Sequence, residues 1–250
     1  MKSMTIRSVV RSDTGLVRKT NEDSVAVLPD QGLVVLADGM GGHCAGDVAS
    51  RLAVAAVSRL ISSHPGASPA TAIRFANHTI IEKIREDPNL RGMATTALVG
   101  RFRDGAIEYA HVGDSRLYLW RDLQLRQLTR DHSMIQELVD EGLYASLAEA
   151  RKDGVKNNLL TRGVGIGEEL SVDSGSLKLC PGDLFLFCSD GLNNMVSDKQ
   201  IERAFSECSG NLEAAVDRLL GLALKRGGYD NISLALVEAA EGEQAKGADV

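Results

Sequence analysis

Aspartates recur at the ends of apolar stretches in this sequence of 250 residues. Short apolar runs are typical of buried strands. A lone buried carboxylate costs too much free energy to persist without a hydrogen bond, an ion pair or a bound cation. Several of them brought together would form an all-oxygen site suited to the hard cations Mg²⁺ or Mn²⁺. One such aspartate is more often a solvated turn residue, so the repetition favours the metal site. The aspartates are Asp23, Asp38, Asp114, Asp190 and Asp230.

The stretch that begins at Asp38 combines a carboxylate, glycines and a histidine. Asp38 follows the apolar run Leu33–Ala37, and a glycine-rich segment at 39–42 leads to His43. Glycines let backbone carbonyls approach a ligand closely, although an ordinary turn has the same composition. His43 is suited to proton transfer near neutral pH, with a turn-stabilising role as the alternative. His111 lies inside a predicted strand, where we expect a hydrogen-bonded core histidine rather than a metal ligand.

The cysteines exclude two other kinds of chemistry. No C-x-x-C pair occurs, and the spacing fits neither a zinc site nor a disulfide framework. We expect reduced thiols, as in cytosolic proteins. The sixth residue after each cysteine is Ser50, Leu186, Asn194 or Ala214, so there is no C-x5-R loop and no cysteine nucleophile of that kind. The cysteines are Cys44, Cys180, Cys188 and Cys208.

Composition narrows the class of protein. Hydrophobic residues make up 44% and charged residues 25%, which is ordinary for a globular chain. The net charge of -6 and the pI near 5.4 disfavour a nucleic-acid surface. No apolar run approaches the length that spans a bilayer, and the N-terminus lacks the apolar core of a signal peptide. We therefore expect a cytoplasmic monomer without nucleic-acid or membrane partners.

The elements that must position the aspartates follow from periodicity. The predicted strands are Thr5–Val10, Ser24–Leu28, Leu33–Ala37, Ala94–Phe102, Ala106–Val112, Arg116–Trp120, Gln124–Leu128, Ser176–Leu179, Leu184–Cys188 and Ile232–Val237. The predicted helices are Ala45–Ser62, a helix that begins at Pro69 and stops before Pro88, Ser133–Glu141, Leu147–Lys152, Asp198–Glu207 and Leu212–Arg226. Hairpin-length connections such as Asp104-Gly105 favour antiparallel sheets. The fold class is α+β in layers, with one domain over 1–238, a polar flap at about 144–167 and a disordered acidic tail at 239–250.

Six motifs in a fixed order resemble the metal-dependent protein phosphatases (PPM, the type 2C Ser/Thr phosphatases) in their bacterial single-domain form. The resemblance covers roughly Arg7 to Val237. It is carried by Arg18 with Asn21-Glu22-Asp23, then Asp38-Gly39-Met40-Gly41-Gly42-His43, His111-Val112-Gly113-Asp114-Ser115-Arg116, Leu128-Thr129-Arg130-Asp131-His132-Ser133, Cys188-Ser189-Asp190-Gly191-Leu192, and Asp230-Asn231.

The resemblance implies two antiparallel β-sheets packed as a central sandwich with α-helices on both faces (αββα layers). It also implies roles for individual residues. Asp38, Asp190 and Asp230 would hold one metal ion, Asp38 and the Gly39 carbonyl a second, and Asp114 with Asp190 a weaker third. Glu22, Asp23 and Asn231 would support these ligands or the waters on the ions. Arg18 would clamp the phosphate, and His43 would be the general acid.

The activity implied is hydrolysis of phosphoserine and phosphothreonine in proteins with Mn²⁺ or Mg²⁺, two ions per active site with a possible third, in opposition to a Hanks-type Ser/Thr kinase. The alternatives are a phosphoprotein-binding pseudo-phosphatase and a small phosphoester hydrolase. No G-x-x-x-x-G-K-[ST] loop is present to bind a nucleotide. Two departures from the family pattern are Ala94 within Met93–Thr96, where we expect only a packing change, and a flap without His-Pro, which bears on substrate preference.

Overall fold

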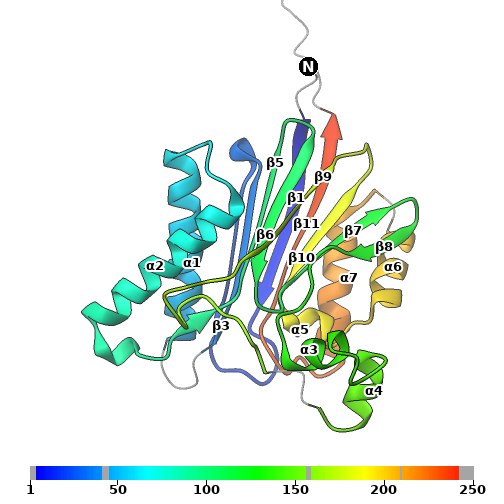
Figure 1. The fold of residues 1–250 in the computed structure, drawn as a ribbon. Coiled ribbons are helices and arrows are strands. Elements are labelled where there is room, and N and C mark those ends of the chain that lie inside the picture. The colour runs from blue at the N-terminus through cyan, green and yellow to red at the C-terminus, as the bar shows by residue number, and fades with distance from the viewer. Residues whose placement is uncertain (1–3, 41–44, 156–158, 209, 242–250) are drawn as a thin grey trace, which may run out of the picture.

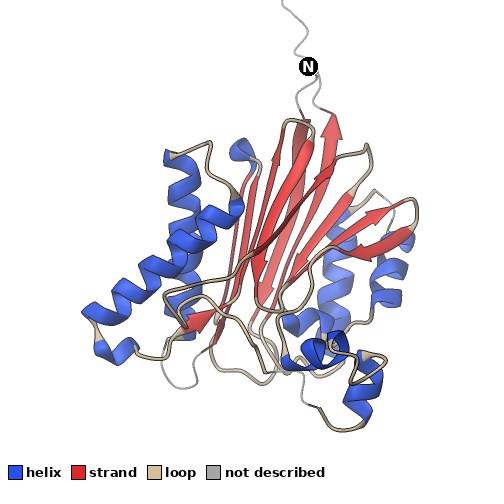
Figure 2. Cartoon of the chain, viewed as in Figure 1, coloured by secondary structure: helices blue, strands red, loops and turns tan. Residues whose placement is uncertain are grey.

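The computed structural model describes residues 4–40, 45–155, 159–208 and 210–241. Its strands form two antiparallel sheets packed face to face, and helices cover both outer faces (Figures 1 and 2). The α+β sandwich expected from the sequence is confirmed.

The two sheets draw on distant parts of the chain. The first has the order β1-β11-β10-β7-β8 and is built from β1 (Met4–Asp13), β11 (Ile232–Glu241), β10 (Leu184–Cys188), β7 (Arg116–Arg121) and β8 (Gln124–Gln127). The second has the order β2-β3-β5-β6-β9 and is built from β2 (Asp23–Leu28), β3 (Leu33–Met40), β5 (Ala97–Arg103), β6 (Ala106–Val112) and β9 (Asp173–Lys178). The two-residue strand β4 (Ala94–Thr95) pairs with the end of β3.

Each outer face is covered by a group of helices (Figure 1). Against the second sheet pack α1 (Gly46–Ser63) and α2 (Pro69–Glu86). Against the first pack α5 (Asp190–Asn193), α6 (Asp198–Glu207) and α7 (Leu212–Lys225). Two short helices, α3 (Met134–Asp140) and α4 (Leu147–Lys152), lie between β8 and β9, and short 3-10 turns occur at Pro29–Gln31 and Pro88–Leu90.

Local sequence explains where these helices begin. The Ser68 side chain accepts a hydrogen bond from the Thr71 N–H, and Pro69 occupies the first helical position, where no backbone donor is needed. Ser197 and Gln200 form a reciprocal capping box at the start of α6. These caps account for the agreement between the predicted and observed starts of α2 and α6.

Strand alternation divides the apolar residues into three layers. On β3, Leu33 and Val35 face α1 and α2, whereas Val34 and Leu36 face the space between the sheets. On β10, Phe185 and Phe187 face the same inter-sheet space, and the alternate residues face α6 and α7. The inter-sheet layer is therefore a continuous apolar core through the middle of the sandwich.

Several predicted boundaries are corrected by the structure. β3 continues through Asp38 to Met40, because its last residues pair with Asp23 and with β4, so Asp38 lies within a strand. The single strand predicted at Ala94–Phe102 is interrupted at Thr96. β9 begins at Asp173, three residues earlier than predicted, because it pairs with β6 as far as His111. β11 extends to Glu241 against β1, so the first residues assigned to a tail are in a strand. The one-turn helix α5 was not predicted.

Candidate active site

Alternation along two paired strands places two carboxylates at one end of the inter-sheet layer. Asp38 has the same strand parity as Val34 and Leu36, which face the space between the sheets. Asp23 lies directly across from Asp38 in the β2–β3 pair. Asp23 is buried, while Asp38 remains partly exposed. The acidic pair is thus reached from solvent at the end of the sandwich.

The remaining predicted aspartates arrive at this end from other strands. Asp190 follows β10, Asp230 precedes the neighbouring strand β11, and Asp114 lies between β6 and β7. All three are partly exposed, and together with Asp23 they act electrostatically on Asp38. The structure therefore brings together the five aspartates singled out from the sequence. We refer to Asp23, Asp38, Asp114, Asp190 and Asp230 as the acidic cluster.

The pKa values of the acidic cluster show the cost of assembling it. Burial, followed by the charges of Asp114 and Asp230, raises the pKa of Asp190 to about 8. Burial raises the pKa of Asp23 to about 6, and burial with the charge of Asp131 does the same for Asp114. Burial and the neighbouring carboxylates also raise the pKa of Asp38 well above its usual range. Without a counter-charge these groups repel one another.

Hydroxyl groups hold the backbone on which Asp38 sits. The Asp38 N–H donates to Thr96 Oγ1 at 2.9 Å, and the Asp38 carbonyl accepts from the Thr96 N–H at 2.8 Å and from Thr95 Oγ1 at 2.9 Å. Thr96 Oγ1 also lies 2.8 Å from Ser115 Oγ, next to Asp114. Thr95, Thr96 and Ser115 are all buried. The strand break at Thr96 thus links the Asp38 strand to the Asp114 loop.

A second group of hydroxyls orients Asp23. Ser189 Oγ donates to Asp23 Oδ2 at 2.7 Å and accepts from the Ser233 N–H at 2.9 Å. Ser233 Oγ lies 2.7 Å from Ser12 Oγ on β1. Ser189 directly precedes Asp190, so this contact joins the two sheets at the acidic cluster. The roles of Ser189, Thr96 and Ser115 were not predicted, although the positions of Ser189 and Ser115 directly beside aspartates were a visible signal.

Only a glycine fits at position 39. A Cβ atom there would collide with the carbonyl oxygens of Gly46 and Glu22, and the Gly39 N–H donates to the Glu22 carbonyl at 3.1 Å. Asn231 fixes the same segment, because its Oδ1 accepts from the Glu22 N–H at 2.8 Å and its Nδ2 donates to the carbonyl of Thr20 at 2.9 Å. Gly39, Glu22 and Asn231 therefore lie together beside Asp38.

Arg18 is placed at the rim of the acidic cluster. Its Nη2 donates to Asp230 Oδ2 at 2.6 Å, and both side chains are partly exposed, at 51% and 37%. The hydrogen bond to Asp230 is the main cause that raises the pKa of Arg18, with smaller contributions from the charges of Glu22 and Asp190. A charged guanidinium fork thus lies half-exposed next to the carboxylates. The predicted general acid His43 lies outside the described residues.

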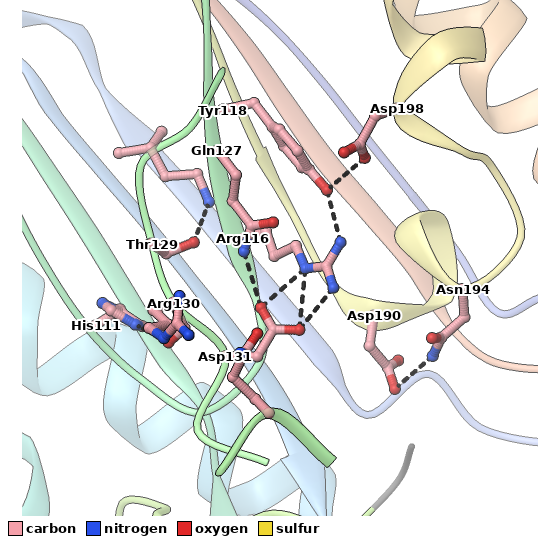
Figure 3. A network of polar contacts seen from close by, with 12 residues as sticks. His111, Arg116, Tyr118, Gln127, Thr129, Arg130, Asp131, Asp190, Asn194 and Asp198 are labelled. Carbon is pink, nitrogen blue, oxygen red and sulfur yellow. Dashed lines mark hydrogen bonds and ion pairs between the residues drawn. The ribbon is translucent and has the colours of Figure 1, made fainter. Parts of the chain in front are cut away.

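A largely buried ion pair links the start of β7, just after Asp114, to the segment that follows β8 (Figure 3). Arg116 Nε and Nη2 donate to Asp131 Oδ1 at 2.9 Å and Oδ2 at 2.6 Å, in the bidentate geometry that arginine favours. Arg116 Nη1 donates to the Tyr118 hydroxyl at 2.9 Å, which donates to Asp198 at the start of α6 at 3.2 Å. Because Asp131 is paired with Arg116, we do not count it as a member of the acidic cluster.

The two buried histidines near the site are neutral. His111 Nε2 lies 2.8 Å from the Arg130 carbonyl, which confirms a hydrogen-bonded core histidine. The rings of His111 and His132 stack at 4.6 Å. Burial, followed by the neighbouring His111 and Arg162, lowers the pKa of His132 to about 4. His111, His132 and Asp173 offer ligand atoms within 4.8 Å of one another, but the Arg162 guanidinium, 3.0 Å from Asp173, already supplies the positive charge there.

The residues of the acidic cluster fit divalent cations. Their donors are all carboxylate oxygens, which are the ligands that hard cations prefer. Asp23 Oδ1 is buried and has no hydrogen-bond partner, and the raised pKa values of Asp38 and Asp190 reflect burial first and the neighbouring carboxylates second. The partial exposure of Asp38 and Asp190 leaves a path for an ion to enter.

Residues 17–222 match the sequence profile of the family described as "Protein phosphatase 2C". The chain belongs to this family of phosphatases. The Serine/threonine protein phosphatase PstP of Mycobacterium tuberculosis is 37% identical over 243 residues, which cover 96% of this chain and 46% of PstP. This chain therefore spans about half the length of PstP. The Serine/threonine phosphatase stp of Listeria monocytogenes is 35% identical over 239 residues, covering 91% of this chain and 94% of the relative.

A solved structure agrees with the family assignment. The crystal structure of the catalytic domain of PstP in complex with two manganese ions superimposes with a TM-score of 0.84 at 38% identity, covering 95% of this chain and all of that domain. The protein phosphatase 2C fold predicted from the motifs is thus confirmed. Within the described part of the chain, no helix is long and apolar enough to cross a membrane.

Proposed function

We propose that this chain hydrolyses phosphoserine and phosphothreonine in proteins with the help of Mn²⁺ or Mg²⁺. The observation that carries the proposal is the convergence of five aspartates from both sheets beside the Arg18 guanidinium. A cluster of carboxylates alone would repel a phosphate dianion, so its use on a phosphoester requires bound cations. The two manganese ions in the PstP catalytic domain support the same reading.

The proposed ligands are those that the resemblance to the family implies. Asp38, Asp190 and Asp230 would hold one ion, Asp38 and the Gly39 carbonyl a second, and Asp114 with Asp190 a weaker third. Glu22, Asp23 and Asn231 would orient these ligands or bound waters. When bound, such ions neutralise phosphoryl oxygens and lower the pKa of water toward neutrality.

The Arg18 guanidinium can pair either with Asp230 or with a phosphate. In the structure its guanidinium pairs with Asp230. A phosphate dianion offers the same guanidinium a bidentate partner of higher charge, while a cation would satisfy Asp230. Arg18 would then bind and orient the phosphoryl group. His43, two residues beyond the glycine that follows Met40, would protonate the leaving serine or threonine oxygen, as expected for a histidine titrating near neutral pH.

The biological setting proposed is the reversal of Ser/Thr kinase signalling, with a Hanks-type kinase and its phosphorylated targets as partners. The names of the relatives, which are serine/threonine phosphatases, support this proposal. We also propose a cytoplasmic site of action for the catalytic domain, since Cys180, Cys188 and Cys208 are free thiols in the structure.

The experiment is a phosphate-release assay on a phosphothreonine peptide with Mn²⁺, with excess EDTA, and with Asp38→Ala in Mn²⁺. Turnover is expected only for the native protein with Mn²⁺. Equal rates in all three conditions would refute the proposal. Binding of the peptide without turnover would indicate a pseudo-phosphatase, and faster hydrolysis of free nucleotides than of the peptide would indicate a small phosphoester hydrolase.

A further inference from the structure

Large apolar side chains are exposed on this protein mainly around the acidic cluster. Among the described residues, one group lies in the loops between β1 and β2 and before β11, namely Leu16, Val17 and Tyr229, at 69%, 59% and 62% exposure. A second group lies between β8 and β9, namely Met134, Leu143, Leu159 and Ile166, at 45% to 64%. In Figure 1 these loops lie at the same, lower end of the sandwich.

One exposed apolar side chain, that of Leu123, lies away from the acidic cluster. Leu123 is 75% exposed in the β7–β8 turn. In the pairing of β10 with β7, Cys188 lies opposite Arg116 and Leu184 lies opposite Trp120. The turn that holds Leu123 therefore adjoins the start of β10, whereas Asp190 follows its end. Isolated exposed leucines are normal on a protein surface, and Leu123 is one of these.

The first group, which we call the Leu16 patch (Leu16, Val17 and Tyr229), adjoins the phosphate clamp. The Leu16 N–H donates to the Gly228 carbonyl at 2.7 Å, which joins the two loops. Leu16 is two residues from Arg18, and Tyr229 directly precedes Asp230, the partner of Arg18. The apolar surface is thus continuous with the Arg18–Asp230 pair.

We call the second group the flap patch (Met134, Leu143, Leu159 and Ile166). Its member Ile166 adjoins the strand that carries Asp38. The space beside Gly163 is bounded by Ile166 Cδ1 and Met40 Cε, at 2.8 and 3.1 Å from where a Cβ would stand. Met40 is two residues beyond Asp38 on β3. The Met134 N–H donates to the Leu159 carbonyl at 2.8 Å, which places these two members of the patch next to each other.

We propose that the Leu16 patch and the flap patch bind bulky apolar side chains that flank the phosphorylated residue of the substrate. This inference rests on the proposed phosphatase activity and adds a substrate class to it. Apolar surface gathered around a polar site marks an interaction surface. Neighbouring residues of an extended peptide are about 3.3 Å apart, so the side chains that reach the Leu16 patch lie within a few residues of the phosphate on Arg18.

Charge favours a peptide over a membrane surface as the occupant. The patches surround the acidic cluster, and the chain carries a net charge of -6. Anionic lipid headgroups would be repelled by this charge. An apolar phosphopeptide places its single dianion on Arg18 and its side chains on Leu16, Tyr229 or Ile166. The phosphate then meets a positive charge, and the apolar side chains meet apolar surface.

The test compares two phosphothreonine peptides of equal length and charge, one with leucines and one with serines on both sides of the phosphothreonine. The kcat/KM for each is divided by the same protein's kcat/KM on p-nitrophenyl phosphate, which has no peptide. The native protein is expected to prefer the leucine peptide by about tenfold, since partial burial of one leucine is worth roughly that ratio. The double variant Leu16→Ser/Tyr229→Ser and, separately, Ile166→Ser are expected to reduce the preference to about threefold or less.

Leu123→Ser is the matched control and is expected to retain the native preference. Equal use of the two peptides by the native protein, or equal loss of preference in Leu123→Ser, would overturn the inference while leaving the phosphatase activity in place. A native dimer on size-exclusion chromatography that the double variant converts to a monomer would also overturn it, because the patch would then bind a second copy. Failure of the native protein to hydrolyse p-nitrophenyl phosphate and both peptides with Mn²⁺ would instead refute the proposed function, and the inference with it.

Discussion

The layer between the two sheets has an apolar middle and an acidic end on the same strands. On β3, Val34 and Leu36 lie in the apolar middle, and Asp38 follows them on the same face. On β10, Phe185 and Phe187 are fully buried, and Ser189 and Asp190 come next. The middle follows the rule that apolar residues stabilise a fold by leaving water. The end breaks that rule with carboxylates whose pKa values are raised.

The difference teaches how stability and function are divided in this fold. The apolar middle holds the sheets together and fixes the positions of the strand ends. The acidic end uses that rigidity to keep carboxyl groups close together, at a cost in free energy that a bound cation would offset. Departures from the rules of folding are expected at functional sites. The effect of changes at the acidic end should therefore depend on metal, whereas the effect of changes in the apolar middle should not.

The largest effect is expected for Asp190→Asn. Removing one carboxylate from the acidic cluster should lower kcat/KM on a phosphopeptide by about a thousandfold, because cation-based charge stabilisation is worth several kcal/mol. The same variant should melt at a higher temperature than the native protein in EDTA at neutral pH, because burial and the neighbouring carboxylates raise the pKa of Asp190 to about 8 and make this aspartate costly to keep in the fold. Calorimetry and the phosphate-release assay measure the two effects. A lower melting temperature in EDTA would contradict the comparison.

Phe187→Ala tests the apolar middle. Phe187 is fully buried, lies 6.5 Å from Phe102 between ring centroids, and fills the space beside Gly100. Its truncation should lower the free energy of unfolding by about 3–5 kcal/mol, by a similar amount with Mn²⁺ and with EDTA. Urea denaturation in both conditions provides the measurement. A loss of stability that appeared only in Mn²⁺ would show that the apolar middle and the acidic end do not contribute independently.

Thr96→Val tests a residue that supports the acidic end without belonging to the acidic cluster. It removes the hydroxyl that accepts from the Asp38 N–H and pairs with Ser115, at nearly constant volume. Loss of such a supporting contact should weaken Mn²⁺ activation by about tenfold, with Thr96→Ser close to native as the control. The Mn²⁺ concentration for half-maximal activity is the measurement. An unchanged value would remove Thr96 from the support of the site.

The smallest effect is a pH dependence of stability in EDTA. The pKa of Asp190 in the folded chain is about 8, and those of Asp23 and Asp114 are about 6, all above the value of an unfolded aspartate. Between pH 4 and 8 the folded state therefore binds more protons than the unfolded state, so stability falls as pH rises. The melting temperature should therefore decrease across this range. Asp190→Asn should flatten the slope, and a rising melting temperature in the native protein would contradict the assignment.

How much of this arrangement could be predicted from the sequence depends on how local each feature is. Periodicity located β6, β10, α4 and α6 at their observed bounds, because alternation and caps act over a few residues. The extension of β3 past Asp38 and the break at Thr96 depend on pairing with strands far along the chain, which local patterns do not contain.

The candidate site shows the same limit. The aspartates were found because each stands at an apolar run, and the resemblance supplied their convergence. The hydroxyls of Thr96, Ser115 and Ser189 and the pairing of Arg116 with Asp131 were not predicted, although every one of these residues except Thr96 lies in a quoted motif. Their roles depend on contacts between the two sheets, so only the folded structure reveals them. His43 remains a prediction from the motif.

The central claim is that the acidic end of the sandwich binds divalent cations. The most direct test is anomalous diffraction at the manganese absorption edge from crystals grown with Mn²⁺. We expect at least two anomalous peaks within coordination distance of Asp38, with Asp190 and Asp230 on one of them and the Gly39 carbonyl on the other. An Mn²⁺-grown crystal with no anomalous peak between Asp38, Asp190 and Asp230 would contradict the account.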